Sequence, residues 1–354
     1  MEGINNKIYF NNNRTTSPDP EVIDLMRSYV PMGNTDLALN TFKKGVASMI
    51  NAEADEIIFT RGTSESINLG LKSCFRYNFE KGKHVITNIS EHFAVLDGCN
   101  ELKALGAEIT YLPVDPEGRI DVQELRNKIR PDTQMLSIMA ANNETGVVQP
   151  IEEVAEFCRE HQITFFTDAC QLVGKTLVDV NDFGFDCAAF GSHKMYGPEG
   201  IGALYIRDKD LRSFLLNNYT FEPELKLAAG FAKAAELFLE QHWENSSHIS
   251  KLKNYMEHQL LDIEGLRING STRHRLYNTS NLTFPEDINV YSLLDKFDFA
   301  HNRCKESYVL KAMGLSSEEI KNSYRFSFGK YNTLDEVKLL VESILGLVNQ
   351  KTLS

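Results

Sequence analysis

The stretch ITFFTDACQ, from Ile163 to Gln171, joins an apolar run to a polar end and indicates the fold class. Its β-branched and aromatic residues favour a buried strand. Asp168 follows this run, where an acid is partly desolvated and needs a cationic partner. In open parallel sheets, ligands bind beyond the carboxyl ends of the strands. Asp168 and Gln171 are therefore the first candidates for a functional site.

Further runs of the same kind lie on both sides of this stretch. They are EIIFT (56–60), HVITN (84–88), EITYLPV (108–114), MLSIMA (135–140), FDCAAFG (185–191) and IGALYI (201–206). Segments with a helical period, for example VLDGCNELKALG and IEEVAEFCREHQ, lie between several of these strands. This alternation predicts an α/β fold whose mostly parallel, doubly wound sheet has seven strands and helices on both faces.

The pattern changes near residue 250. There a charged amphipathic helix, KLKNYMEHQLLDIEG, precedes NTSNLTFPED, YRFSFGKYN and the closing helix TLDEVKLLVESILGLVNQ, which together are typical of an α+β unit. A chain of 354 residues can bury two cores. We predict a large domain at residues 12–250 and a smaller domain made of residues 1–11 and 251–354.

Composition and charge argue against several classes of protein. The chain is 42% hydrophobic and 24% charged, which is ordinary for a globular protein. A formal net charge of −12 disfavours nucleic acid or an anionic membrane as the main partner. The start MEGINNKIYF has no apolar signal core, and no segment reaches membrane-spanning length. The six cysteines form no C-x-x-C pair, so we expect no metal site, no disulfides and a cytoplasmic location.

Other polar residues stand at the ends of the predicted strands. Thr63 and Ser64, in RGTSES (61–66), would either cradle a phosphate at a helix N-terminus or simply cap that helix. His92 follows one strand and Asn143 ends another, and each residue taken alone is compatible with a structural role.

GSHKMYGPEGIG (191–202) places Lys194 after a small-residue strand, where it is either a surface residue or a lysine that forms a Schiff base. The features in their order along the chain match one chemistry. Pyridoxal phosphate needs a lysine to bond to, a carboxylate at its ring nitrogen and a phosphate cradle. It also needs a group that stacks on the ring and a donor to the phenolic oxygen.

At these residues the chain resembles the cysteine desulfurases, in the class V aminotransferase group of fold-type-I pyridoxal phosphate enzymes. The resemblance is carried by DEIIFTRGTSESINL, SEHFAVLDGC, ANNETGVVQPI, TDACQLVGKTLVDV, GSHKMYGPEGIGALY, SYVLKAMGL and YRFSFGKYNT. It implies a pyridoxal phosphate-dependent enzyme that converts L-cysteine, or a related selenium amino acid, into alanine and transferable sulfur. It also implies an intimate homodimer and a sulfur-acceptor protein as partners.

The resemblance implies a role in cofactor chemistry for four residues. Lys194 would bond to the cofactor, release the substrate and move protons. Asp168 would pair with the pyridine nitrogen, and Gln171 would donate to the phenolic oxygen. His92 would stack on the ring and shuttle a proton.

Phosphate and substrate contacts follow from the same resemblance. Thr63, Ser64 and His193 would hold the phosphate. Asn143 would contact the cofactor and orient the substrate, and Arg325 would grip the substrate carboxylate with both of its terminal nitrogens.

The chain departs from the family pattern in two segments near this site. FLLNNYTFEPELKLAAG lacks the glycines and the arginine with which family members reach the neighbouring subunit's phosphate, and Thr220 is the candidate replacement. In NNNRTT (11–16), Arg14 stands where a small alanine is usual. Arg14 would bind a second carboxylate, fill space left by the shortened loop, or point to solvent.

A third departure concerns the sulfur acceptor. In AHNRCKESYVLKAMGL (300–315), Cys304 lies between two cations that favour the reactive thiolate. The family carries its nucleophile on a longer mobile loop, and without gaps that position falls near Phe299 or Ala300. A short loop limits the reach of Cys304.

Three hypotheses therefore stand. The first is a cysteine desulfurase in which Cys304 accepts sulfur. The second is a pyridoxal phosphate-dependent lyase, epimerase or aminotransferase that acts on another amino acid, with Arg14 favouring a dicarboxylic one. The third is a non-catalytic scaffold, which would need none of Lys194, Asp168, Gln171 or His92.

Overall fold

A seven-stranded sheet forms the centre of the computed structural model, which describes residues 7–31 and 33–352. Its strands, in chain order, are β2 (Ile57–Thr60), β3 (His84–Asn88), β4 (Glu108–Leu112), β5 (Thr133–Ser137), β6 (Thr164–Asp168), β7 (Cys187–Gly191) and β8 (Gly202–Ile206). Their order across the sheet is β2-β8-β7-β6-β5-β3-β4. Strand β8 is antiparallel to both neighbours, and the other pairs are parallel. The prediction of a mostly parallel seven-stranded sheet is confirmed.

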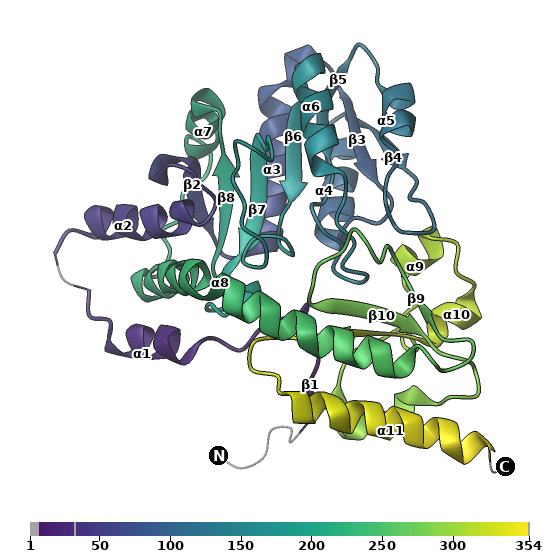
Figure 1. The fold of residues 1–354 in the computed structure, drawn as a ribbon. Helices are drawn as coiled ribbons and strands as arrows, with labels where there is room; N and C mark the ends of the chain where they lie inside the picture. Colours follow the sequence, from purple (N-terminus) through teal and green to yellow (C-terminus); the bar gives the residue numbers. More distant parts are fainter. Residues whose placement is uncertain (1–6, 32, 353–354) are drawn as a thin grey trace.

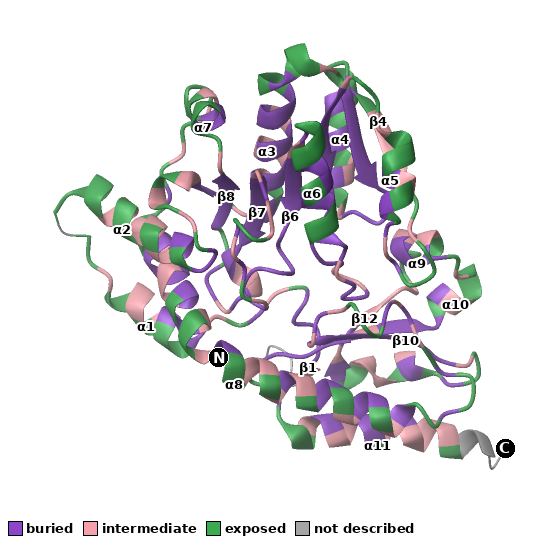
Figure 2. Cartoon of the chain, turned by 45° about the horizontal axis from the view of Figure 1, so that its top comes forward, coloured by how far each residue is buried: buried purple, intermediate pink, exposed green. Residues whose placement is uncertain are grey.

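Helices cover both faces of this sheet, as Figure 1 shows. Because successive side chains of a strand point to opposite faces, a strand in the middle of the sheet contributes side chains to the cores on both faces. Phe165 packs in the core that contains α6 (Ile151–His161), whereas its neighbour Phe166 packs in the core that contains α3 (Thr63–Tyr77) and α4 (Phe93–Ala104). Strands β2, β3, β5, β7 and β8 are buried throughout and purple in Figure 2, whereas the edge strand β4 is mostly half-buried.

The parallel arrangement brings the polar strand ends together. Strands β3, β5, β6 and β7 run in one direction, and β2 shares it because two antiparallel steps separate β2 from β7. Their carboxyl ends therefore lie at one edge of the sheet, where the segments with the predicted site residues begin.

A helix of 36 residues, α8 (Leu225–Leu260), connects this sheet with a second unit. Phe231 in its first half packs in the large core, and Met256 in its second half packs in the smaller one. Residue 250 thus lies inside a continuous helix, since one helix packs against both cores. The division at that residue stays a prediction.

The second unit is built on a four-stranded sheet in the order β12-β13-β10-β9. Its strands are β9 (Arg267–Ile268), β10 (Thr279–Thr283), β12 (Ala300–His301) and β13 (Ser323–Ser327), and α11 (Leu334–Thr352) packs against α8 below it. Near the N-terminus, β1 (Ile8–Tyr9) pairs with β11 (Phe297–Asp298). This pairing brings the first described residues beside the second unit.

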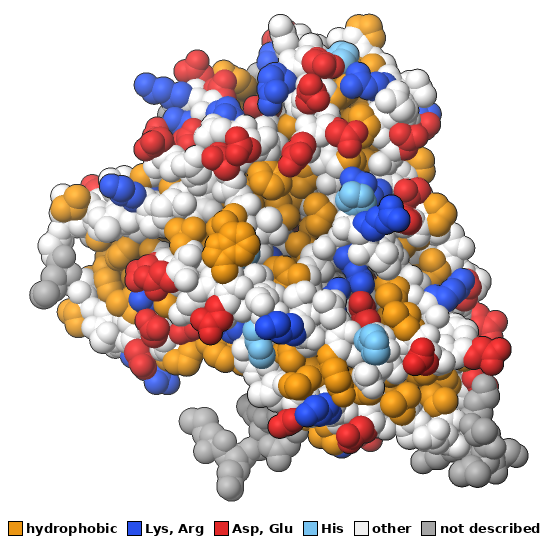
Figure 3. Space-filling model, in the orientation of Figure 1, with side chains coloured by type: hydrophobic (Ala, Val, Ile, Leu, Met, Phe, Trp, Pro, Cys, Tyr) orange, Lys and Arg blue, Asp and Glu red, His pale blue; other side chains and the backbone are white. Residues whose placement is uncertain are grey.

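The remaining helices lie mainly at the periphery. They are α1 (Pro20–Ser28), α2 (Thr35–Ser48), α5 (Val122–Lys128), α7 (Lys209–Leu216), α9 (Tyr308–Ala312) and α10 (Ser317–Lys321). Acidic and basic side chains are interspersed on the face shown in Figure 3 rather than gathered by sign. Across the described ranges, no helix combines the length and the apolar character needed to cross a membrane.

Candidate active site

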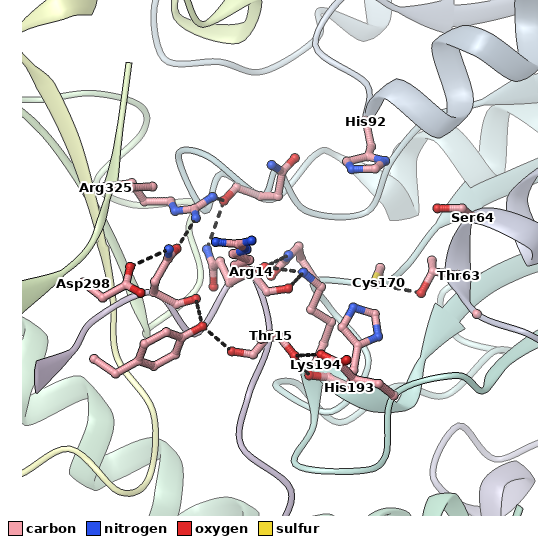
Figure 4. Close-up of a pocket in the computed structure, with 18 of the residues that line it drawn as sticks. Arg14, Thr15, Thr63, Ser64, His92, Cys170, His193, Lys194, Asp298 and Arg325 are labelled. Carbon is pink, nitrogen blue, oxygen red and sulfur yellow. Dashed lines mark hydrogen bonds between the residues drawn. The ribbon is translucent and has the colours of Figure 1, made fainter. Parts of the chain in front are cut away.

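A cavity of about 1300 Å³ opens at the carboxyl edge of the sheet, between the large sheet and the second unit. Most of the predicted site residues line it: Arg14, Thr63, Ser64, His92, Asn143, Asp168, Gln171, His193, Lys194 and Arg325. Figure 4 shows His92, Ser64, Thr63, His193, Lys194, Arg14 and Arg325 around this space. Cys304 and Thr220 are not among the lining residues.

Lys194 ends the short helical turn Ser192–Lys194 that follows β7. Its ammonium nitrogen donates to the backbone carbonyls of Asn13 and Arg14. Burial lowers the pKa of Lys194, and the cations Arg325 and Arg14 lower it further against the opposing effects of Cys170 and Asp168. A lysine with a lowered pKa is more readily neutral, which makes its amine a nucleophile.

Asp168 is the last residue of β6 and is 5% exposed. One carboxylate oxygen accepts a hydrogen bond of 3.0 Å from the Cys170 backbone N–H. Burial raises the pKa of Asp168, while Cys170, His92 and Lys194 oppose this effect. Within the described residues, no protein cation forms an ion pair with this carboxylate. The expected cationic partner therefore has to be a ligand, and a protonated pyridine nitrogen suits it.

His92 is the N-cap of α4, and its Nδ1 accepts a hydrogen bond of 3.2 Å from the Ala94 backbone N–H. In a neutral imidazole this leaves the proton on Nε2. Gln171 is buried in the cavity wall, and its amide N–H donates to the Asn13 carbonyl at 3.0 Å.

The N-terminus of α3 has the features of a phosphate cradle. Its N-cap is Gly62, which has a φ of 150° and offers no capping oxygen. Thr63 and Ser64 are the first two helical residues, so neither of them caps this helix. Apart from its chain neighbours, no atom of the described residues lies within 4 Å of where a side chain on Gly62 would begin, which leaves room for a ligand against the backbone.

His193 lies beside this helix end. Burial and the neighbouring Lys194 lower the pKa of His193 to about 4. The imidazole is therefore neutral at pH 7 and can donate one hydrogen bond to a phosphate oxygen.

The segment that carries Thr220 packs against the same helix end. The Tyr219 hydroxyl donates to Glu65 at 3.0 Å, and the Arg61 guanidinium lies 4.5 Å from the centre of the Phe221 ring. Thr220 itself is exposed between these two contacts. Its role in binding phosphate stays a prediction.

Arg325 of β13 spans two acceptors on the opposite side of the cavity. It donates to the Asn143 carbonyl at 2.8 Å and to the Asn11 amide oxygen at 2.6 Å. Among the described residues, neither the Arg325 Nε nor the Asn143 amide oxygen, both buried, has a hydrogen-bond partner. Since buried polar atoms are normally paired, these two atoms point to a polar ligand.

Arg14 lies with its guanidinium between Arg325 and Lys194, as Figure 4 shows. The residue is exposed to the cavity and lines it. Of the three expectations for Arg14, this position fits an anion contact or space filling better than a side chain that points away from the site.

Cys304 is exposed in the turn between β12 and α9. Both flanking cations are held by aromatic rings. The Arg303 guanidinium lies 4.6 Å from the Tyr291 ring centre, and the Lys305 ammonium lies 3.9 Å from that of Phe93. Phe299 and Ala300, where the family pattern puts its nucleophile, line the cavity instead.

Sequence reasoning missed two residues that shape this site. The Asn13 carbonyl accepts hydrogen bonds from both Lys194 and Gln171. The Lys175 ammonium donates a hydrogen bond to the side-chain oxygen of Gln171. Asn13 gave no signal, because it acts through its backbone. Lys175 did give one, since it stands four residues after Gln171 within the motif TDACQLVGK.

The donor set fits pyridoxal phosphate. Around one cavity lie a lysine with a lowered pKa, a buried carboxylate that forms no ion pair within the described part of the chain, and a helix N-terminus without a side-chain cap. The lysine suits the aldehyde of the cofactor, the carboxylate suits its ring nitrogen, and the helix N-terminus suits its phosphate.

Comparisons with known proteins agree with this chemistry. Residues 8–340 match the family model described as aminotransferase class-V. The mitochondrial cysteine desulfurase of Saccharomyces cerevisiae is 37% identical, and the match covers 95% of this chain and 74% of that protein. The cysteine desulfurase IscS of Mannheimia succiniciproducens is 36% identical, covering 88% and 82% of the two chains.

Solved structures are similar as well. A NifS-like protein superposes with a TM-score of 0.87 at 28% identity, covering 97% of this chain and 99% of that one. A structure described as SspA in complex with cysteine has a TM-score of 0.80 at 29% identity, covering 92% and 100%. The chain is therefore a pyridoxal phosphate-dependent enzyme rather than a scaffold, and it belongs to the aminotransferase class-V family as a relative of the cysteine desulfurases.

Proposed function

We propose that this protein is a cysteine desulfurase that converts L-cysteine, or the related selenium amino acid, into alanine and transferable sulfur. The observation that carries the proposal is the position of Lys194, Asp168 and His92 in one cavity with Arg325. The curated relatives at 36–37% identity act as cysteine desulfurases by name, which supports the same reaction here.

When bound, pyridoxal phosphate supplies an electron sink for the bonds at the substrate's α and β carbons. In this chain Asp168 would keep the ring nitrogen protonated, and Thr63, Ser64 and His193 would hold the phosphate. Lys194 would bond to the cofactor. Its amine, freed when substrate binds, would then take the proton from the substrate Cα.

The substrate would be held by its carboxylate. Arg325 already spans two neutral oxygens, of Asn143 and Asn11, and its buried Nε has no partner among the described residues. A carboxylate is a stronger acceptor than either oxygen, so it would compete well for this guanidinium. His92 would lie against the ring and exchange a proton through Nε2.

Sulfur transfer needs a thiolate that reaches the substrate sulfur. An S–S bond forms as the substrate C–S bond breaks, which leaves a persulfide on the protein. Cys170 lines the cavity, but burial raises the pKa of its thiol, and the thiol lies 3.3 Å from the Thr63 hydroxyl. Cys304 is the exposed cysteine, so we propose that it accepts sulfur after movement of its turn.

The test is to incubate the holoenzyme with L-cysteine and measure alanine and sulfide. We expect equal amounts of both in the presence of a reducing thiol. The Cys304→Ala variant should lose turnover, whereas the matched Cys170→Ala variant should keep it. No alanine from fully loaded enzyme would contradict the proposed reaction, and the reverse order of the two variants would contradict the choice of Cys304.

A second candidate function follows from Arg14. Its guanidinium in the cavity favours an amino acid with a second anionic group, and Cys304 is not a lining residue. The protein would then be a lyase, an epimerase or an aminotransferase whose reaction has no persulfide step. Turnover of L-aspartate or L-glutamate that survives Cys304→Ala but falls in Arg14→Ala would favour this reading.

We further propose a homodimer, a sulfur-acceptor protein and a cytoplasmic location. The homodimer is proposed from the family resemblance alone. All six cysteines are free, which suits a reducing compartment. Light scattering of the purified protein tests the dimer, and a monomer at micromolar concentration would contradict it.

A further inference from the structure

Lys175 is a buried lysine that the proposed reaction leaves without a role. It is 5% exposed and follows the tight turn at Gly174. Its ammonium donates to the Gln171 side-chain oxygen at 2.7 Å and to the Gln171 backbone carbonyl at 3.2 Å. Within the described residues, it forms no ion pair with a carboxylate. A buried ammonium with only neutral acceptors is costly, so its position calls for a reason.

The contact decides which way the Gln171 amide faces. Lys175 holds the amide oxygen, so the amide nitrogen points the other way and donates to the Asn13 carbonyl at 3.0 Å. A flipped amide would place its N–H groups against the ammonium, which carries donors and no acceptor. Lys175 therefore excludes the flipped orientation and leaves the second N–H of Gln171 free for a ligand.

The same contacts continue to Lys194. The Asn13 carbonyl that accepts from Gln171 also accepts from the Lys194 ammonium. Asn13 is held in turn by its side chain, which donates to the Thr279 hydroxyl at 2.8 Å and to the Asn143 carbonyl at 3.1 Å. The path from Lys175 to the cofactor lysine is thus made of direct hydrogen bonds.

Charge makes this arrangement sensitive to pH. Burial lowers the pKa of Lys175 to about 7, Lys194 and Arg325 add to the effect, and Cys170 opposes it. Below this pKa the ammonium donates strongly to Gln171, and above it a neutral amine donates weakly. The orientation of Gln171 is therefore held more firmly at lower pH.

We propose that Lys175 is a positioning residue that fixes the Gln171 amide so that its free N–H meets the phenolic oxygen of the cofactor. The inference rests on the proposed function only through the cofactor. Its test uses cofactor binding and absorption without substrate, so failure of desulfurase turnover would leave the inference standing.

The experiment compares Lys175→Met, which removes the donor, with Lys175→Gln, which keeps a neutral donor. Pyridoxal phosphate affinity and the absorption spectrum of the bound cofactor are recorded between pH 6 and 9. We expect Lys175→Met to weaken binding about tenfold, as for loss of a charged hydrogen bond, and to shift the spectrum and its pH midpoint. Lys175→Gln should recover only part of the affinity, because its amide can donate to Gln171 but can also accept from a flipped Gln171 amide.

Two controls separate positioning from general damage. In a Gln171→Leu background, Lys175→Met should have no further effect on affinity or spectrum, because the two residues act as one unit. Lys253→Met removes another buried lysine, in α8, and should leave cofactor binding unchanged. An unchanged spectrum and affinity in Lys175→Met, or equal losses with and without Gln171, would overturn the proposal.

Discussion

Gly202→Ala should damage the phosphate cradle from the sheet side. Gly202 begins β8, and a methyl group there would lie 2.6 Å from the carbonyl carbon of Gly62 and 2.9 Å from the Thr63 nitrogen. Ordinary contacts of this kind begin at 3.4 Å, so the backbone at the N-terminus of α3 has to move by about 0.8 Å. The clash is with backbone, and rotation of a side chain cannot relieve it.

We expect two measurable losses from this substitution. Overpacking of this kind costs about 1–3 kcal/mol of unfolding free energy, which urea denaturation of the cofactor-free protein measures. Displaced N–H groups at the helix end should also weaken pyridoxal phosphate binding about tenfold, equivalent to about 1.4 kcal/mol. Pyridoxal, which lacks the phosphate, should lose less affinity, since only the cradle has moved.

Gly346→Ala is the matched control. Gly346 lies within α11, and no neighbouring atom stands within 4 Å of the added carbon. This variant should gain about 0.5–1 kcal/mol, because alanine favours a helix interior, and its cofactor affinity should not change. The predicted clash would be refuted by a Gly202→Ala variant that unfolds at the same urea concentration as the wild type. Such a variant would also bind pyridoxal phosphate and pyridoxal with wild-type affinities.

Three further outcomes are expected elsewhere. Arg275→Met should cost about 1.5–3 kcal/mol in urea unfolding, because the buried Glu257 carboxylate loses two charged hydrogen bonds of 2.7 Å and keeps only the Lys253 ammonium, 3.6 Å away, as an ion-pair partner among the described residues. Burial raises the pKa of Glu91, so the folded state binds its proton more tightly and stability falls as pH rises above about 4.5. The Glu91→Gln variant should lose less stability than the wild type between pH 5 and 8. Parallel plots of unfolding free energy against pH for the two proteins would contradict this expectation. Arg325→Lys should raise KM for L-cysteine about tenfold, since lysine cannot grip a carboxylate bidentately, and an unchanged KM would remove Arg325 from the substrate site.

The sheet could be predicted because each of its strands carries its own signal. β6 carries two successive aromatic residues because both of its faces are covered, and Phe165 and Phe166 pack in opposite cores. Once the strands are parallel, the positions of Asp168 and Lys194 follow, as both stand where a strand ends. The rule about strand ends thus predicted which of these residues lie around the cavity, without any knowledge of contacts.

Arg325 and Arg14 lie outside that rule. Arg325 is in the middle of β13 of the second sheet, and Arg14 is in an N-terminal segment held beside it. Neither position follows from the local pattern, because both depend on how the second unit packs over the first. Only the family resemblance pointed to them. The boundary near residue 250 was uncertain for the same reason, since α8 packs against both cores.

Lys175 was missed because a lysine is usually exposed, and its position four residues after Gln171 indicates proximity but not burial. Its burial is tertiary, since it comes from how the turn after β6 packs, which the chain pattern does not record. Cys304 shows the reverse case. The sequence places Cys304 between Arg303 and Lys305. In the structure these two cations lie against the rings of Tyr291 and Phe93. The charges next to Cys304 in the sequence therefore do not predict how far it lies from the cavity.

The charges around the cavity also suggest why these lysines have lowered pKa values. Lys194, Arg325 and Arg14 line the cavity together with the buried acid Asp168, and Lys175 lies behind its wall at Gln171. Burial is the main cause for both lysines and Arg325 lowers both pKa values further, so the cost of holding these cations near one another falls when an anion enters. A phosphate ester with a phenolic oxygen supplies that anion. Cofactor binding should therefore raise the pKa of Lys175 above about 7, so that the ammonium is charged, and grips Gln171 most firmly, in the loaded enzyme.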